Sequence, residues 1–247
     1  MLYGIDVSNW DKDLEIPESL DFCIVKATGG TSFVDGCCEG FVQQCMRKGI
    51  LWGYYHFAGD YRQIDPEAEA SFFYEHTQGY TGYGIPVLDI ESDHIANWGS
   101  YAQRFVDKYH AITGIWPVIY CQASSLDSFA GYPLVETCGL WVAGYPDGRT
   151  YRIGDTPPTF PYRVSPWPFA ALWQYSSEGV AQGYDGRLDL DVAFMDAHAW
   201  ELYATGGKGY KDATEKLPTV TTPAAKAPTW TLENQHVKVD ITLKGKE

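Results

Sequence analysis

The segment PVLDIE at residues 86–91 joins an apolar, strand-like run to two acidic side chains, Asp89 and Glu91. Side chains alternate between the two faces of a strand, so residues spaced i, i+2 point the same way. Two like charges held together at the end of a buried strand raise the proton affinity of at least one of them. Glycosidic bond cleavage uses such a pair, because it needs one carboxylic acid kept protonated and one carboxylate kept ionised.

Strand-like and helical segments alternate around this pair. The predicted strands are residues 2–7, 22–27, 50–57, 85–91, 117–121, 140–143, 170–175 and 188–192. The predicted helices are residues 36–48, 66–77 and 98–113. This alternation implies right-handed parallel units, and eight strands fit a barrel whose usual length is about 250 residues. The predicted fold class is therefore α/β, an irregular TIM-like (β/α) barrel. Its helices are reduced in the second half, because residues 156–167 are too rich in proline for a regular helix.

A parallel barrel gathers its functional groups at the C-terminal ends of the strands. Polar and aromatic side chains stand at or near those ends along the whole chain. They are Asp6, Lys26, Tyr55, His56, Asp89, Glu91, Tyr120, Trp141, Trp173, Gln174, Asp189 and Asp191. Carboxylates from three separated strands that meet at one barrel mouth are hard to assign to stability alone, so we expect a catalytic cleft.

The composition limits the partners. The net charge is −14, from 18 Lys and Arg against 32 Asp and Glu, and an acidic chain gains nothing from phosphate contacts. We therefore expect no nucleic acid partner. No segment is as long and apolar as a membrane-spanning helix, so no membrane partner is expected either. The 9 Trp and 18 Tyr suit stacking on sugar faces as well as core packing.

The six cysteines show neither a CxxC pair nor zinc-ligand spacing. Cys23 and Cys121 lie in apolar strand-like runs and read as buried free thiols, while a disulfide through Cys37 or Cys38 stays open. A metal site built from the acidic residues and His56 is the weaker alternative, since the chain has no HExxH motif. We expect no metal and no cofactor.

Seven motifs together resemble glycoside hydrolase family 25, the lysozyme-type muramidases of phage endolysins and bacterial autolysins. They are GIDVSNW (4–10), VKATGG (25–30), GYYHFA (53–58), PVLDIES (86–92), LWVAGY (140–145), LWQY (172–175) and LDLDVAF (188–194). The resemblance covers residues 1–204 and is specific in combination, although each motif alone is weak. It implies hydrolysis of the β-1,4 bond between N-acetylmuramic acid and N-acetylglucosamine in peptidoglycan, on an irregular β/α barrel.

The resemblance also implies roles for single residues. Glu91 resembles the family's proton donor, and Asp89 resembles the partner that stabilises a charged intermediate. Asp6 and Asp189 match two further aspartates of the site. Asp191 stands where the family more usually has asparagine, which adds a carboxylate. The remaining predicted substrate contacts are Tyr55, Tyr120, Trp141, Trp173, Gln174 and Lys26.

The chemistry leaves the course of the reaction open. Retention or inversion depends on the separation of the two carboxyl groups. We favour the route in which the substrate's own acetamido oxygen is the nucleophile and Asp89 holds the acetamido group; a covalent intermediate is the alternative. Two other functions compete with a muramidase: a glycan-binding barrel without activity, and a chitinase-like enzyme on unmodified N-acetylglucosamine polymers.

Several site residues also have ordinary structural interpretations. Asp6 could cap the turn that follows it, and Lys26 could be a core-edge lysine paired with Asp6 or Glu91. His56 lies in an apolar run, which favours a hydrogen-bonded structural histidine. Asp191 could be a solvated charge at a strand end.

The last forty or so residues differ from the rest of the chain. Residues 205–229 read as an extended linker. Residues 230–247 contain an apolar–polar alternation that predicts a short β-hairpin, which could dock, self-associate or bind the cell wall. The N-terminus lacks the basic and apolar regions of a signal peptide. We therefore expect synthesis in the cytoplasm and action on the wall after release, for example through a phage holin.

Overall fold

Eight strands form a closed ring in the computed structural model, which describes residues 1–59, 65–207, 231–234 and 237–240. The strands of the ring are β1 (Leu2–Val7), β2 (Phe22–Gly29), β4 (Leu51–Phe57), β5 (Ile85–Asp89), β6 (Val118–Gln122), β7 (Leu140–Ala143), β8 (Leu172–Gly179) and β9 (Leu188–Ala193). They pair in this order, and β9 returns to pair with β1. The predicted eight-stranded α/β barrel is confirmed.

The last strand runs against the others. β9 pairs antiparallel with both β8 and β1, so the expectation of parallel units is wrong for this strand. The reason is the length of the β8–β9 connection, residues 180–187. A parallel crossover needs about a dozen residues or more, whereas an antiparallel return needs only a short loop. The two-residue β3 (Phe33–Val34) also pairs antiparallel, with β2, outside the ring.

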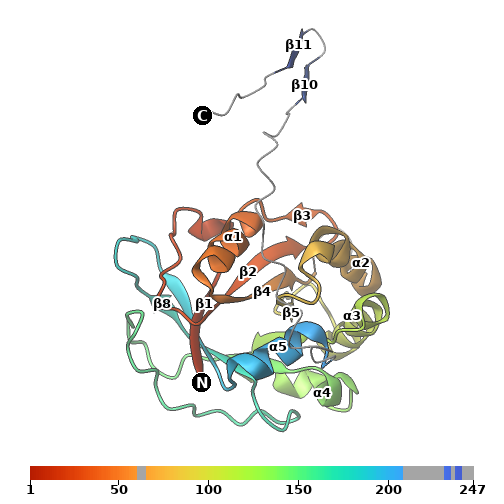
Figure 1. The fold of residues 1–247 in the computed structure, drawn as a ribbon. Coiled ribbons are helices and arrows are strands. Elements are labelled where there is room, and N and C mark those ends of the chain that lie inside the picture. The colour runs from red at the N-terminus through yellow and green to blue at the C-terminus, as the bar shows by residue number, and fades with distance from the viewer. Residues whose placement is uncertain (60–64, 208–230, 235–236, 241–247) are drawn as a thin grey trace. The chain divides into compact units, whose positions relative to one another are not determined.

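The three predicted helices are present on the outside of the barrel (Figure 1). They are α1 (Cys38–Lys48), α2 (Pro66–Thr77) and α3 (Trp98–Thr113). The Asp65 carboxylate caps α2 and the Asn97 side chain caps α3, as expected for short polar residues at a helix start. In the second half, α4 (Leu134–Thr137) has one turn, and residues 156–167 form neither helix nor strand. The predicted loss of regular helices there is confirmed.

The barrel has an inner and an outer core. The inner core fills the ring with alternate side chains of the strands, among them Phe22, Val87 and Leu172. Helix α5 (Ala197–Thr205) adds Trp200 to it, and the Trp200 and Phe22 rings lie 4.8 Å apart between centroids. Because Phe22 begins β2, this contact closes the N-terminal end of the ring. The outer core lies between the strands and the helices. The opposite end of the ring, where the parallel strands have their C-terminal ends, carries the predicted site residues.

The chain divides into two compact units, residues 1–209 and 210–247. In the second unit β10 (Thr231–Asn234) pairs antiparallel with β11 (Val237–Asp240). The predicted linker lies outside the described residues beyond residue 207, and the role of the hairpin stays a prediction. No helix in the described ranges is long and apolar enough to cross a membrane.

Candidate active site

Asp89 and Glu91 lie at the C-terminal end of β5 and are called the acid pair below. β5 ends at Asp89, two residues before its predicted end, but the chain stays between its neighbours. Ala58 N donates to the Asp89 carbonyl at 2.9 Å, and Ile90 N donates to the Tyr120 carbonyl at 3.0 Å. Asp89 is 7% exposed and Glu91 is half-buried. The more accessible member of the pair is therefore Glu91.

The acid pair binds protons more tightly than free carboxyl groups do. Burial raises the pKa of both side chains, and repulsion from Glu91 further raises the pKa of Asp89. The positive charge of Lys26 opposes both shifts. Two carboxylates so close in a buried site do not both ionise readily, so the environment favours a form of the pair that shares one proton.

Three further aspartates, the inner carboxyls Asp6, Asp189 and Asp191, come from β1 and β9. Asp6 and Asp189 are direct cross-strand partners, and Asp191 follows two residues further along β9 on the same face. Asp6 lies near the end of β1, whereas Asp189 lies near the start of β9. The two residues can be neighbours at the same end of the barrel only because β9 runs antiparallel to β1.

Burial is the largest cause of a raised pKa in all three inner carboxyls. Repulsion from Asp191 adds to the rise for Asp6, and repulsion from Asp6 adds to the rise for Asp189, whose pKa reaches about 8. Burial therefore favours the protonated form of all three carboxyl groups, which limits the negative charge at the barrel mouth.

Gln174 on β8 connects the inner carboxyls to two tyrosines. Its Nε2 donates to Asp6 Oδ2 at 2.7 Å. Its Oε1 accepts from the Tyr120 hydroxyl at 2.9 Å and from the Tyr145 hydroxyl at 2.6 Å. The alternative role of Asp6 as a turn cap is not supported, since Ser8 itself caps that turn.

Tyr145 is missing from the predicted site, although it closes the motif LWVAGY. The residue is 47% exposed while its hydroxyl donates to Gln174. Burial, and then the charges of Asp189 and Asp6, raise its pKa, so it lies near the inner carboxyls. Its position, two residues past the end of β7, is the signal that could have identified it.

Lys26 lies among aromatic rings rather than in the core. Its ammonium is 4.7 Å from the centroid of Phe57, 5.6 Å from Phe33 and 5.7 Å from Tyr55. Rings at these distances stabilise the cation. The Tyr55 hydroxyl belongs to the same region, because burial and then the charges of Asp6 and Asp89 raise its pKa.

The two predicted tryptophans have different positions, and neither is open to solvent. Trp141, 2% exposed, points into the barrel, where its Nε1 donates to Asp191 Oδ1 at 2.8 Å. This bond makes Asp191 a buried, partnered group rather than a solvated strand-end charge. Trp173, 1% exposed, points outward and its Nε1 donates to the Gly144 carbonyl at 2.9 Å. Gln174, the next residue on the strand, takes the inward face, so Trp173 packs in the outer core. The predicted sugar contact by Trp173 stays a prediction.

His56 is a fully buried, hydrogen-bonded histidine, which confirms the structural interpretation. All six cysteines are free thiols. Among the described residues, no group of three or more His, Cys, Asp or Glu side chains could hold a metal ion.

An open hollow of about 400 Å³ lies between the β5–α3 connection and the segment after β6. No predicted site residue lines it. Its lining residues are Ile95, Ala96, Asn97, Trp98, Ser125, Ser128 and Tyr132.

Comparison with known proteins gives consistent matches. Residues 5–184 match the family model described as glycosyl hydrolases family 25. An N,O-diacetylmuramidase from Chalaropsis sp is 30% identical over 203 residues, which cover 73% of this chain and 90% of that protein. Lysozyme M1 from Streptomyces globisporus is 28% identical over 204 residues, which cover 75% of this chain and 65% of that protein.

Solved structures match the barrel as well. The crystal structure of the bacterial lysozyme from Streptomyces coelicolor superimposes with a TM-score of 0.67 at 26% identity. The match covers 83% of this chain and 98% of that one, so the two share the barrel from end to end.

Proposed function

Because the chain belongs to glycosyl hydrolases family 25, and is thus a lysozyme-type glycosidase acting on peptidoglycan, we propose that Glu91 protonates the leaving oxygen of the scissile bond. The bond is the β-1,4 linkage between N-acetylmuramic acid and N-acetylglucosamine. One observation carries this assignment: Glu91 is the accessible member of two carboxyl groups that lie together at the end of β5, and burial raises the pKa of both. A general acid must carry a proton to the substrate and must reach it; burial raises the pKa of Glu91, which favours the protonated form, and its side chain is the more exposed of the two.

Asp89 is the partner that holds the substrate's acetamido group. Its Oδ1 is buried and has no hydrogen-bond partner among the described residues, so it is free to accept the acetamido N–H. The acetamido carbonyl oxygen then attacks the anomeric carbon, the glycosidic C–O bond breaks, and the Glu91 proton moves to the leaving oxygen.

Water completes the reaction. The Glu91 carboxylate takes a proton from a water molecule, the water oxygen bonds to the anomeric carbon, and the acetamido group is restored. The inner carboxyls support this cycle by holding two other predicted site residues in place, because Asp6 accepts from Gln174 and Asp191 accepts from Trp141. A covalent bond from Asp89 to the sugar is the competing route.

The test compares wild type with Glu91→Gln and with Asp93→Asn, which removes an exposed carboxylate two residues away. Each protein is incubated with purified Gram-positive walls and with chitin, followed by turbidity and mass spectrometry of the fragments. We expect fragments with reducing-end muramic acid from wild type and Asp93→Asn, and none from a folded Glu91→Gln. Comparable turnover by Glu91→Gln would refute the assignment, and preferred release from chitin would favour the chitinase-like alternative.

The biological role proposed here is lysis of bacterial cells by an endolysin-type enzyme that meets the wall after release from the cytoplasm. Cutting the glycan strand supports this role, since the strand carries the wall's tension. Addition of the protein to intact Gram-positive cells should lower viable counts, and Glu91→Gln should leave the counts unchanged.

A further inference from the structure

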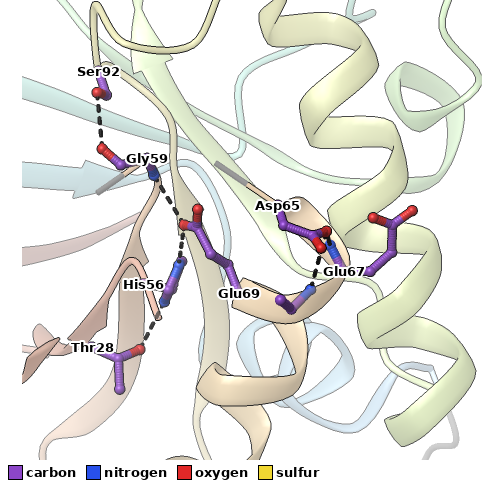
Figure 2. A network of polar contacts seen from close by, with 8 residues as sticks. Thr28, His56, Gly59, Asp65, Glu67, Glu69 and Ser92 are labelled. Carbon is purple, nitrogen blue, oxygen red and sulfur yellow. Dashed lines mark hydrogen bonds and ion pairs between the residues drawn. The ribbon is translucent and has the colours of Figure 1, made fainter. Parts of the chain in front are cut away.

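A buried polar network connects two strands, a helix and the loop after the acid pair (Figure 2). Its centre is Glu69 on α2, whose Oε2 accepts from His56 Nε2 at 3.0 Å and from Gly59 N at 2.9 Å. His56 Nδ1 lies 2.8 Å from the Thr28 hydroxyl. The Gly59 carbonyl accepts from Ser92 Oγ at 3.2 Å. We call His56, Glu69, Gly59 and Ser92 the Glu69 clamp.

The hydrogen bonds of the clamp agree with a neutral histidine. Burial lowers the pKa of His56, which favours the uncharged ring. A neutral ring with its proton on Nε2 donates to Glu69 and leaves Nδ1 to accept from Thr28. The side chains of both His56 and Glu69 are fully buried. Burying a carboxylate is expensive, and an apolar pair would fill the same space at lower cost. The arrangement therefore calls for an explanation other than stability.

The far end of the clamp lies next to the catalytic acid. Ser92 directly follows Glu91 in the chain, and its Oγ also accepts from His94 N at 3.3 Å. The Ser92 carbonyl accepts from Ile95 N at 3.1 Å, which closes the turn. The Ser92 side chain is thus fixed by its bond to the Gly59 carbonyl, and the Ser92 backbone is fixed by its bond to Ile95.

Gly59 permits this contact because it has no side chain. Its φ is +81°, and a Cβ there would lie 2.9 Å from Ile95 Cγ1 and 3.1 Å from Ser92 Oγ. The Ser92 side chain, in the loop after β5, therefore contacts the Gly59 backbone, in the loop after β4, directly. Glu69 and Ser92 are therefore linked through a single residue, Gly59, whose N–H binds Glu69 and whose carbonyl binds Ser92.

We propose that Glu69 and Ser92 are positioning residues that fix the orientation of the Glu91 side chain through Gly59. The proposal rests on the proposed role of Glu91 as the acid. Proton transfer needs the acid within hydrogen-bond distance of the glycosidic oxygen, and a displacement of about 1 Å can lower the rate about 100-fold. Glu91 lies just beyond the end of β5. The clamp supplies a hydrogen bond to the next residue, Ser92, and this bond holds the backbone there in place of a strand partner.

The experiment uses Ser92→Ala, Glu69→Ala and Glu69→Gln in the full-length chain, with Thr77→Val as the control. Thr77 ends the same helix that carries Glu69, is 1% exposed, and its hydroxyl donates to the Phe73 carbonyl at 2.6 Å. Thr77→Val therefore removes a buried hydrogen bond of similar kind that does not lead to Glu91.

Wall hydrolysis is measured as kcat and KM well below each variant's melting temperature. We expect Ser92→Ala and Glu69→Ala to lower kcat by about 10- to 100-fold with little change in KM, and Thr77→Val to keep the wild-type kcat. Glu69→Gln keeps an oxygen that can accept from His56 and Gly59, so it should restore most of the kcat lost in Glu69→Ala.

A structural role alone would give a different pattern. If Ser92→Ala and Glu69→Ala lower the melting temperature as Thr77→Val does but keep the wild-type kcat, the positioning role is refuted. The same series includes Glu91→Gln. Full activity of Glu91→Gln would overturn the proposed acid and the clamp's role with it, whereas an inactive Glu91→Gln beside a fully active Ser92→Ala would overturn the clamp only.

Discussion

Replacement of Asp189 by asparagine should stabilise the protein, and the gain should grow with pH. The folded state raises the pKa of Asp189 from 3.8 to about 8, mainly through burial. Between these two values the unfolded chain has lost this proton and the folded chain still holds it. The free energy of unfolding of the wild type therefore falls as pH rises through this window. Asparagine has no titratable proton, so in the variant the free energy of unfolding does not fall with pH for this reason.

The size of the effect follows from the two pKa values. Each pH unit inside the window changes the free energy of unfolding by about 1.4 kcal/mol. Between about pH 5 and about pH 7 the full effect is about 2.7 kcal/mol. Asp189 is partly exposed and solvent screens its charge, so we expect about 1–2 kcal/mol. The contribution of the amide itself does not depend on pH and cancels when the two pH values are compared.

Urea unfolding of wild type and Asp189→Asn at both pH values measures this difference. The matched control is Asp127→Asn, which removes an exposed carboxylate on the segment after β6. Its effect on the free energy of unfolding should be nearly the same at both pH values. If the gain from Asp189→Asn were also the same at both, the carboxyl of Asp189 would ionise normally in the folded protein, and the argument for a protonated inner group would fail.

Three further substitutions test other parts of the site and the barrel. Lys26→Met should shift the pH–rate profile to higher pH, because the lost cation no longer lowers the pKa values of the acid pair; an unshifted profile would refute this electrostatic role. Tyr120→Phe should lower the free energy of unfolding by about 1 kcal/mol in a denaturant titration, since Gln174 loses one of its two hydroxyl donors; an unchanged value would mean that the remaining donor suffices. Gly4→Ala should cost about 3 kcal/mol by the same titration, because its Cβ would lie 2.5 Å from the Phe22 carbonyl oxygen; a neutral result would show that β1 can shift.

The sequence predicted the barrel well because its main signals are local. Apolar runs bounded by turns located the strands, and the apolar spacing in residues 66–77 and 98–113 located α2 and α3 to the residue. The direction of β9 was not predictable from its own residues, since period-two alternation is the same for parallel and antiparallel strands. The predicted strands leave residues 176–187 as the connection, which is long enough for a parallel crossover. In the structure β8 continues to Gly179, and only residues 180–187 remain for the return.

The candidate site was predictable in its residues but less so in their geometry. The i, i+2 spacing of Asp89 and Glu91 places both at one strand end whatever the tertiary structure is. The face of Trp173 depends on which neighbour points inward, and the strand sequence leaves both choices open. The pairing of His56 with Glu69 depends on how α2 packs on β4, which thirteen residues of sequence separation do not reveal.

The antiparallel return of β9 also has an evolutionary consequence. In a fully parallel barrel every strand reaches the catalytic end only once, through the loop that follows it. Here β8 ends and β9 begins at that end, so residues 180–187 form a hairpin loop at the rim, where the Tyr184 hydroxyl donates to Asp11 Oδ1 at 3.1 Å. Hairpin loops accept insertions without disturbing the strands they join. An insertion in this loop would therefore change the rim of the barrel while Asp189 and Asp191 keep their register with β1.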